Sequence, residues 1–400
     1  MNISEPKTEH AIPAIWRQAF RPLFLMGSIF AILSMATWAL WLTGKVSFSP
    51  YGGMYFWHGH EMLFGFVSAI IVGFLLTAVQ NWTGLRATHG SSLIVLFSLW
   101  LAGRLLIVFN PLSIQWLTAI IDASFLLLAA VFMGKLVLKV KQYRNLIFVP
   151  ILALLVMGNL LTHWSVLAQQ PEYYRWGTYT TVMTITLIIS IIAGRIFPMF
   201  TANGTNTKKV ANLEWLEKVV IGLTLILALL FLTNLSSYLP KMVMAVTFGL
   251  AAVCHTIRAL RWRPQVTFGT PLVWSLHLAY WFVPASLALF AMHFAGGNIS
   301  PSTALHGLTA GAISSLILAM IARISLGHTG RPLQPRRTMT FAFMMIILAG
   351  ISRVSVEYLQ EFTSANLYVV AAILWVFAYL LYVLGYWKIL TSPRPDGRLG

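Results

Sequence analysis

About twelve stretches of mostly apolar residues run along this chain, and each has about the 20 residues that a helix needs to cross a bilayer. Charged residues make up only 9% of the sequence, against about 25% in an ordinary soluble domain, which excludes a soluble globular enzyme. Backbone groups left unpaired in lipid are costly, so we predict an all-α, polytopic membrane bundle of about twelve transmembrane helices. Their predicted ranges are 22–43, 57–79, 91–109, 113–134, 146–168, 174–197, 216–235, 240–260, 271–293, 302–326, 338–358 and 367–388.

The basic residues predict how this bundle is oriented. All but five of the 27 Lys and Arg residues fall on one side of the predicted membrane, as the positive-inside rule requires of the cytoplasmic side. We therefore predict cytoplasmic termini, with an N-terminal segment at 1–21, a single transmembrane bundle at 22–390 and a tail at 391–400. The net charge of +17 then serves orientation and anionic headgroups rather than nucleic acid. The first apolar run is too long for a signal-peptide core, so we expect it to be a membrane helix.

Two parts of the sequence are alike at a fixed offset. The second predicted helix reads HEMLFG from His60, the tenth reads HGLTAG from His306, and a Thr-Gly pair begins 23 residues after each histidine. The helix that follows each contains Leu-Ala-Gly and then an arginine, Arg104 or Arg353. The offset is an even number of helices, so both copies cross the membrane in the same direction. We predict parallel repeats of four helices, in three units with a diverged middle one.

Ionisable side chains inside predicted helices are candidates for a buried site, because lipid does not solvate them. Neutral imidazole is a strong ligand for haem iron and for copper. His58 and His60 lie about 200° apart around a helix, so a regular helix cannot aim both at one site. Either one binds a metal while the other faces a neighbour, or the turn is unwound. The layer near the predicted outer surface consists of His58, His60, Glu61, Arg104, Asp122, His163, His293, His306 and Arg353.

The acidic residues of this outer layer have two interpretations each. Glu61 can orient an imidazole as a hydrogen-bond acceptor, or it can pair with Arg104 or Arg353. Asp122 is expected to pair with Arg104 on the preceding helix, and a proton-relay role for Glu61 and Asp122 is the alternative.

A second layer lies toward the predicted inner surface. His277 sits about 9 Å inside its helix, which makes it the histidine hardest to explain as a surface residue. Arg195 and Arg323 either extend to the headgroups or hold a haem propionate. The single cysteine, Cys254, excludes an intrachain disulfide and is expected to be a small apolar side chain rather than a ligand. The layer consists of His89, Arg195, Cys254, His255, His277, Arg323 and His328.

Several long motifs resemble the NnrS family of bacterial inner-membrane proteins. The two most specific are WHGHEMLFGF from Trp57 and the ARISLGHTGRPL end of the tenth helix, and the matches extend from the first helix to the eleventh. The matching stretches are AFRPLFL from Ala19, WHGHEMLFGF from Trp57, GFLLTAVQNWTG from Gly73, AGRIFPMFTANG from Ala193, LHLAYWFVP from Leu276, LHGLTAGAISSLILAMIARISLGHTGRPL from Leu305, and LAG from Leu348 with Arg353 downstream.

The resemblance implies a protein with haem and copper that is linked to nitric oxide metabolism or resistance. Accordingly we predict haem b, with copper as a second metal, in a protein of the bacterial inner membrane that binds or detoxifies nitric oxide. The predicted metal ligands are His58, His60, His277 and His306, and the predicted cofactor-binding residues also include His328, Arg195 and Arg323. His163, His255 and His293 lie outside the matching motifs and are weaker candidates.

Two alternatives stay open at this point. Twelve helices with parallel repeats also suit a proton-coupled secondary transporter, in which the histidines would carry protons. A structural or assembly protein would not need the two polar layers. Nitric oxide can also be bound without being reduced. Reduction would require a quinol or another electron donor, and protons from the only buried acidic pair, Glu61 and Asp122.

Overall fold

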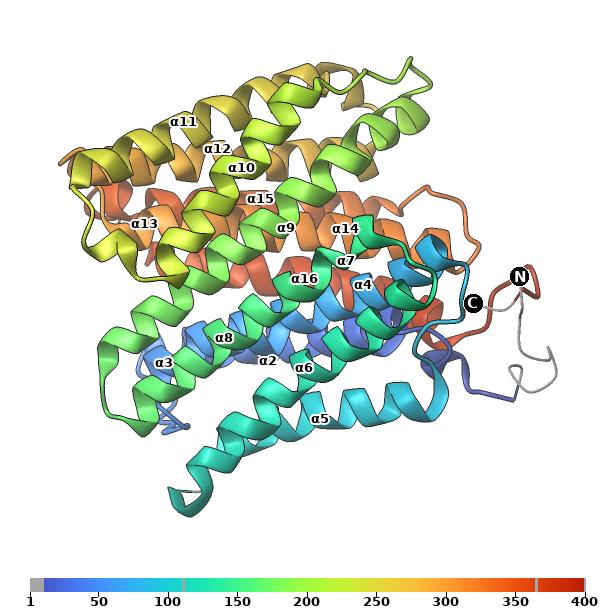
Figure 1. The fold of residues 1–400 in the computed structure, drawn as a ribbon, viewed down its shortest axis with the longest axis horizontal. Coiled ribbons are helices and arrows are strands. Elements are labelled where there is room, and N and C mark those ends of the chain that lie inside the picture. The colour runs from blue at the N-terminus through green and yellow to red at the C-terminus, as the bar shows by residue number, and fades with distance from the viewer. Residues whose placement is uncertain (1–10, 110–111, 364–365, 399–400) are drawn as a thin grey trace. The chain divides into compact units, whose positions relative to one another are not determined.

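The computed structural model describes residues 11–109, 112–363 and 366–398. Across those residues it contains twelve helices that are long and apolar enough to cross a membrane, and no strand (Figure 1), which confirms the predicted fold class. The first ten residues of the predicted N-terminal segment and the last two of the tail lie outside the described residues. The helices are α2 (Phe20–Leu42), α3–η2–α4 (Gly53–Thr83), α5 (Gly90–Phe109), α6 (Gln115–Lys139), α7–α8 (Tyr143–Leu167), α9 (Pro171–Thr205), α10 (Glu214–Leu232), α11 (Lys241–Arg261), α12 (Pro271–Phe294), α13–η6–α14 (Pro301–His328), α15–η7 (Arg337–Phe362) and α16 (Leu367–Thr391).

The chain forms two compact units. Unit 1 comprises residues 1–181, 323–333 and 383–400, and unit 2 comprises 182–322 and 334–382. In unit 1, α2 packs on α4 and η2, while α6 packs on α4, α5 and α8. In unit 2, α12 packs on α11, α13, α15 and η6, and α10 packs on α11. Figure 1 shows α5 and α6 side by side in one unit and α10, α11 and α12 grouped in the other.

The two helices of the predicted repeat share an irregular turn. A π-helical segment follows His60 directly as η2 (Glu61–Val67), and another follows His306 directly as η6 (Gly307–Ile313). Each is closed by a serine hydroxyl that donates to the carbonyl five residues earlier, from Ser68 and from Ser314. Such turns insert one extra residue and occur frequently at functional sites. The shared turn adds support to the repeat and changes the direction in which the following side chains point.

Helix α9 continues past the residue where the sequence predicted its end. Pro198 lacks the N–H that would bond to the carbonyl of Gly194, which favoured a break at 197. In the structure, Asn212 Nδ2 donates to that carbonyl at 3.2 Å. The freed acceptor is therefore satisfied by a side chain, and the helix runs on to Thr205.

The start of α2 and the end of α16 lie together within unit 1. The buried Arg21 side chain donates from Nη1 to the carbonyls of Leu390 and Ser392 at 2.8 and 2.9 Å. A positive charge at a helix C-terminus compensates the unpaired carbonyls there. The placement of both ends on the cytoplasmic side of the membrane stays a prediction.

Helices α8 and α9 approach closely at two glycines in unit 1. A Cβ on Gly177 would lie 2.6 Å from the carbonyl oxygen of Gly158 and 2.9 Å from the backbone nitrogen of Thr162. We expect Gly177→Ala to destabilise the protein by about 1–3 kcal/mol, because rigid backbone must move to admit the methyl group. Thermal unfolding in lipid nanodiscs measures this. Gly222→Ala is the control, since a Cβ there meets nothing within 4 Å. An equal loss in both variants would contradict the prediction.

Candidate metal centre

Three side chains from three helices meet inside unit 1. His60 ends α3, Asp122 lies on α6 and His163 lies on α8. The Nε2 atoms of His60 and His163 lie 3.3 Å and 3.2 Å from Asp122 Oδ2, and the three ligand atoms all lie within 4.8 Å of one another. All three residues are buried, with exposed fractions of 4% or less. Two imidazole nitrogens and one carboxylate oxygen so arranged suit a first-row metal ion, whose ligands lie about 2.0–2.2 Å away.

Each imidazole has a hydrogen-bond partner on Nδ1, the nitrogen that faces away from Asp122, and this partner helps to orient Nε2 toward the other ligand atoms. His60 Nδ1 lies 3.0 Å from Glu61 Oε1, and a carboxylate only accepts, so a metal-bound ring would keep its proton on Nδ1 and offer the lone pair of Nε2 to the ion. His163 Nδ1 lies 3.2 Å from the hydroxyl of Tyr51. Burial raises the pKa of Tyr51, so its neutral phenol can either donate to that nitrogen or accept from it. Such an outer partner is the usual companion of a metal-bound histidine.

Arg104 on α5 links the two carboxylates of the cluster. Its Nη1 donates to Glu61 Oε1 at 2.8 Å, and its Nη2 pairs with Asp122 Oδ1. The predicted pairing of Asp122 with Arg104 is confirmed, and Glu61 makes both predicted interactions, one with an imidazole and one with Arg104. Two glycines leave the room for this arrangement. A Cβ on Gly65 would meet Arg104 and Glu61, and a Cβ on Gly103 would meet Asp122.

Asn159 on α8 completes the ring of polar atoms. Its Nδ2 donates to Asp122 Oδ2 at 2.6 Å and lies 3.4 Å from His60 Nε2, so the amide nitrogen bridges these two acceptors. Its Oδ1 is buried and has no hydrogen-bond partner among the described residues. Turning the amide by 180° would exchange the two atoms and present Oδ1 to the convergence point. The site therefore contains a fourth side chain with an oxygen donor available to a metal ion.

The charges of the cluster favour a bound cation. Glu61 and Asp122 carry two negative charges, Arg104 carries one positive charge, and neutral imidazoles add none. A buried charge without compensation is strongly destabilising. A metal ion at the convergence point supplies positive charge: a monovalent ion leaves the cluster neutral, and a divalent ion changes its net charge from −1 to +1. Protonating one imidazole is the other solution, which would make the cluster a purely structural ion-pair network.

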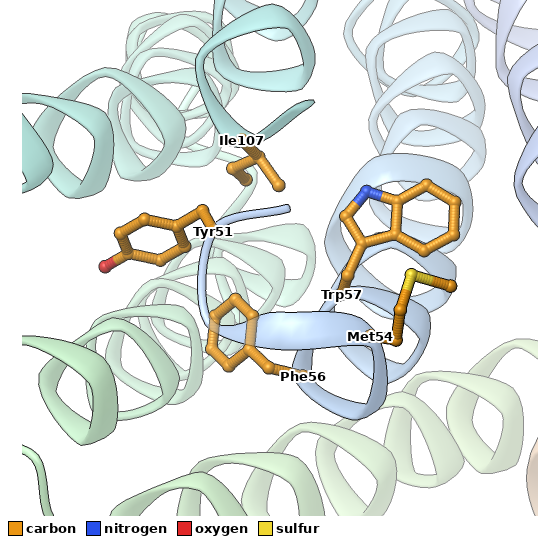
Figure 2. Packing of buried hydrophobic residues seen from close by; sticks show 5 residues of the cluster. All are labelled: Tyr51, Met54, Phe56, Trp57 and Ile107. Atoms are coloured by element: carbon orange, nitrogen blue, oxygen red, sulfur yellow. The ribbon is translucent and has the colours of Figure 1, made fainter. Parts of the chain in front are cut away.

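An aromatic layer packs beside the cluster. It contains the buried residues Tyr51, Met54, Phe56, Trp57 and Ile107. Figure 2 shows Tyr51 and Phe56 on one side of α3, and Trp57 and Met54 on the other. The Phe56 ring stacks on that of His60, with centroids 5.0 Å apart and planes at 17°. Tight packing of this kind excludes water, which strengthens every electrostatic interaction in the site.

The surroundings of His60 do not fit an axial haem ligand. A porphyrin bound through Nε2 would need free space in the plane across that atom. Asp122 Oδ2 lies 3.3 Å from Nε2, and the rings of Phe64 and His163 lie 4.9 Å and 4.8 Å from the imidazole. The same close approach of oxygen and nitrogen atoms fits a single ion. The donor set at His60 therefore fits a single first-row metal ion, and its close neighbours do not fit a porphyrin bound through Nε2.

The other predicted residues of unit 1 lie apart from this cluster. His58 stacks on Trp38 with centroids 4.3 Å apart, so His60 faces the cluster while its neighbour faces another helix. This is the first of the two arrangements expected for a pair two residues apart. His328 ends α14 with its ring 5.7 Å from that of Phe20, and Arg323 is a buried residue of the same helix.

The remaining predicted residues belong to unit 2. His277 is buried, and its Nε2 lies 2.8 Å from the hydroxyl of Thr201. His306 Nδ1 lies 3.0 Å from Arg353 Nη2 and 2.8 Å from the carbonyl of Ser302. Arg195 is half-buried on α9. Ligation by His277 and His306 stays a prediction.

Two residues of the cluster, Asn159 and Tyr51, are not predicted from the sequence, and a third, His163, is predicted only as a weaker ligand candidate. Asn159 and Tyr51 are not ionised near neutral pH, so a search for charged groups passed over them. His163 lay in the predicted outer layer but outside the recognisable motifs. Its spacing from Asn159 was the available signal, because residues four apart share one face of a helix.

A polytopic, all-helical membrane protein with a buried histidine–carboxylate cluster is the class that the fold and the site define. The chain belongs to the NnrS family, whose model, described as NnrS protein, matches residues 14–394, nearly the whole chain. The resemblance found in the sequence is thereby confirmed. A search of curated proteins finds no match.

Proposed function

We propose that this chain is a metalloprotein of the bacterial inner membrane that binds nitric oxide at a buried metal ion, with both termini in the cytoplasm. The observation that carries the proposal is the convergence of His60 Nε2, His163 Nε2 and Asp122 Oδ2 inside unit 1. Copper is the metal that both the imidazole-rich donor set and the family favour. When bound, a copper ion would supply a redox-active centre with an open position for a diatomic ligand.

The residues around the metal site would orient the ligands, compensate charge and exclude water. Glu61 and Tyr51 hold the outer imidazole nitrogens, so the ligands keep their orientation when the metal leaves. Arg104 prevents the two carboxylates from repelling each other. The aromatic layer keeps water out, while a small neutral molecule such as nitric oxide can enter through lipid and apolar side chains. Haem b, where bound, would use histidines away from this cluster, of which His277 and His306 are the predicted ones.

Metal analysis of histidine variants tests this proposal. We expect the purified wild-type protein, loaded with copper and desalted, to retain one ion per chain. His163→Ala and His60→Ala should each lose it, because each removes one of three ligands. His58→Ala should retain it, since that ring faces Trp38. Electron paramagnetic resonance should show coupling to two imidazole nitrogens in the wild type and a changed spectrum when nitric oxide is added.

Two outcomes would contradict the proposal in different ways. Equal copper retention by wild type and His163→Ala would refute the cluster as the metal site. If the ion is tightly bound but its spectrum does not change when nitric oxide is added, the cluster remains a metal site and the proposal that it binds nitric oxide is refuted.

The shared π-helical turn favours a second candidate function. Matching irregular turns after His60 and His306 fit parallel repeats, which occur in secondary transporters. A proton-coupled transporter would be metal-free and colourless, and would acidify or alkalinise the lumen of proteoliposomes when its substrate is added. A metal-retaining protein without such proton movement would exclude this function.

A further inference from the structure

A second buried polar cluster lies in unit 2, and none of its residues belongs to the metal cluster of unit 1. Its centre is the hydroxyl of Tyr280 on α12. Arg258 on α11 approaches this oxygen with Nε at 3.1 Å and with Nη2, and His255 Nδ1 lies 2.6 Å from it. Arg258 Nη1 also donates to Glu217 Oε2 on α10 at 3.1 Å. Tyr280, His255 and Arg258 are fully buried, while the Glu217 side chain is 18% exposed.

The chemistry of these groups fixes the direction of each hydrogen bond. An arginine only donates, so both Arg258 contacts occupy the two acceptor positions of the Tyr280 oxygen. The single O–H of Tyr280 therefore points to His255 Nδ1, which must accept. A neutral imidazole then carries its proton on Nε2, which lies 3.1 Å from the Thr224 hydroxyl and 3.4 Å from that of Ser190.

The same arrangement is already suited to the product of a proton transfer. If the Tyr280 proton moves to His255 Nδ1, the phenolate oxygen keeps both Arg258 donors and gains an N–H from the imidazolium. No side chain has to turn. A charged oxygen that accepts several prepositioned donors is strongly stabilised in a buried site.

Arg258 thus has two acids as alternative anionic partners. Glu217 is ionised in one state, and Tyr280 would be ionised in the other. A buried guanidinium that loses one counter-ion favours formation of the other, since an uncompensated buried charge is costly. Gly194 on α9 makes the first pairing possible, because a Cβ there would meet the Glu217 carboxylate and lie 3.4 Å from Arg258 Nη1.

Glu217 is also the member of the cluster that water can reach. It lines a cavity of about 460 Å³ at the start of α10, whose walls include Asn212, Glu214 and Lys218. Glu214 is a neighbouring acid that pairs with Lys218 at 3.8 Å and has a highly exposed side chain. Among the described residues, Arg258 and His255 are the titratable groups that hydrogen-bond to Tyr280 or Glu217, and Glu214 and Lys218 line the same cavity as Glu217.

We propose that Glu217, Arg258, Tyr280 and His255 form a proton-relay site that takes up a proton from the cavity and delivers one to His255. An O–H bond forms on the Glu217 carboxylate with a proton from water. The O–H bond of Tyr280 breaks, and an N–H bond forms at His255 Nδ1. The cluster gains one positive charge, equal to the one proton taken up, and Arg258 itself neither gains nor loses a proton. The imidazolium then faces the hydroxyls of Thr224 and Ser190.

The proposal has an unusual optical signature. Free tyrosine becomes phenolate only as the pH rises, whereas Tyr280 should become phenolate as the pH falls and Glu217 is protonated. We expect mild acidification of the purified protein in nanodiscs to produce the near-ultraviolet phenolate band of one tyrosine. Glu217→Gln should show that band already at neutral pH, because glutamine cannot neutralise Arg258. The band should be absent from Tyr280→Phe and from the Glu217→Gln, Tyr280→Phe double variant.

The controls separate a relay from a structural network. Glu214→Gln removes an acid from the same cavity but does not touch Arg258, so its spectrum should match that of the wild type. Acidification of the wild-type protein requires no variant, so it still tests whether Tyr280 forms a phenolate if Glu217→Gln does not fold. Absence of a phenolate band in the acidified wild type would overturn the proposal. Persistence of the band in Tyr280→Phe would assign it to another tyrosine and overturn it as well.

Discussion

Replacing Arg104 with methionine is expected to destabilise the metal-free protein by about 3–5 kcal/mol, the usual consequence of removing one partner from a buried ion pair. Arg104 is 2% exposed, and its guanidinium contacts both carboxylates of the cluster. Without it, Glu61 and Asp122 would retain two negative charges in a site that water does not reach. Unfolding free energies of the two proteins, measured in mixed micelles after chelation of metals, provide the comparison.

Metal should reverse most of this loss. A divalent ion adds two positive charges, so the metal-loaded cluster carries a net charge of about +1 in the wild type and is neutral in Arg104→Met. Added copper should therefore stabilise the variant more than the wild type. Arg104→Lys is the matched control, because it keeps the charge while losing the two-pronged geometry. Equal stabilisation of wild type and Arg104→Met by copper would indicate that the ion binds elsewhere.

The positions of the helices followed from the sequence because lipid imposes a simple length rule. In the described part of the chain, the twelve apolar stretches correspond to twelve helices, with ends that differ by only a few residues in most cases. The largest difference lies at α9, where the expected break at Pro198 did not occur. The substitute donor comes from Asn212, fourteen residues further along the chain. No local sequence pattern predicts that the side-chain amide of Asn212 will donate to the carbonyl of Gly194.

The candidate site followed from the sequence only in part. Charge alone predicted that Arg104 and Asp122 would pair, since each needs a buried partner. It did not predict which imidazoles converge, because that depends on the rotation of each helix about its axis. The π-helical turn after His60 alters that rotation in a way that composition does not indicate. His58 faces Trp38 and His163 faces Asp122, and neither contact followed from the sequence.

The same dependence on rotation explains the cluster in unit 2. His255 was kept only as a weak ligand candidate, and Tyr280 attracted no attention, because each residue is unremarkable on its own helix. Their significance arises from the 2.6 Å contact between them and from Arg258, which reaches both Tyr280 and Glu217. The sequence therefore predicts which polar groups lie in the membrane more reliably than it predicts which of them meet.

Replacing Glu61 with glutamine should weaken copper binding, whereas Arg104→Met should strengthen it. We expect copper affinity to fall about 10–100-fold, the usual effect of losing an outer partner of a metal-bound histidine. Glutamine can still accept from His60 Nδ1 but no longer supplies the negative charge that makes this imidazole a better ligand. The metal-free protein should lose much less stability than Arg104→Met does, because the cluster becomes neutral. Copper titration against a competing chelator measures the affinity.

Tyr51→Phe is the companion variant, since it removes the outer partner of His163 without changing any charge. Its copper affinity should fall less than that of Glu61→Gln. The decisive comparison is the direction in which copper affinity changes in Glu61→Gln and in Arg104→Met. A metal centre requires Glu61→Gln to weaken copper binding and Arg104→Met to strengthen it, because one removes negative charge near the ion and the other removes positive charge. A structural ion-pair network has no reason to produce opposite signs, and both substitutions would then act only by loosening the packing of α3, α5 and α6.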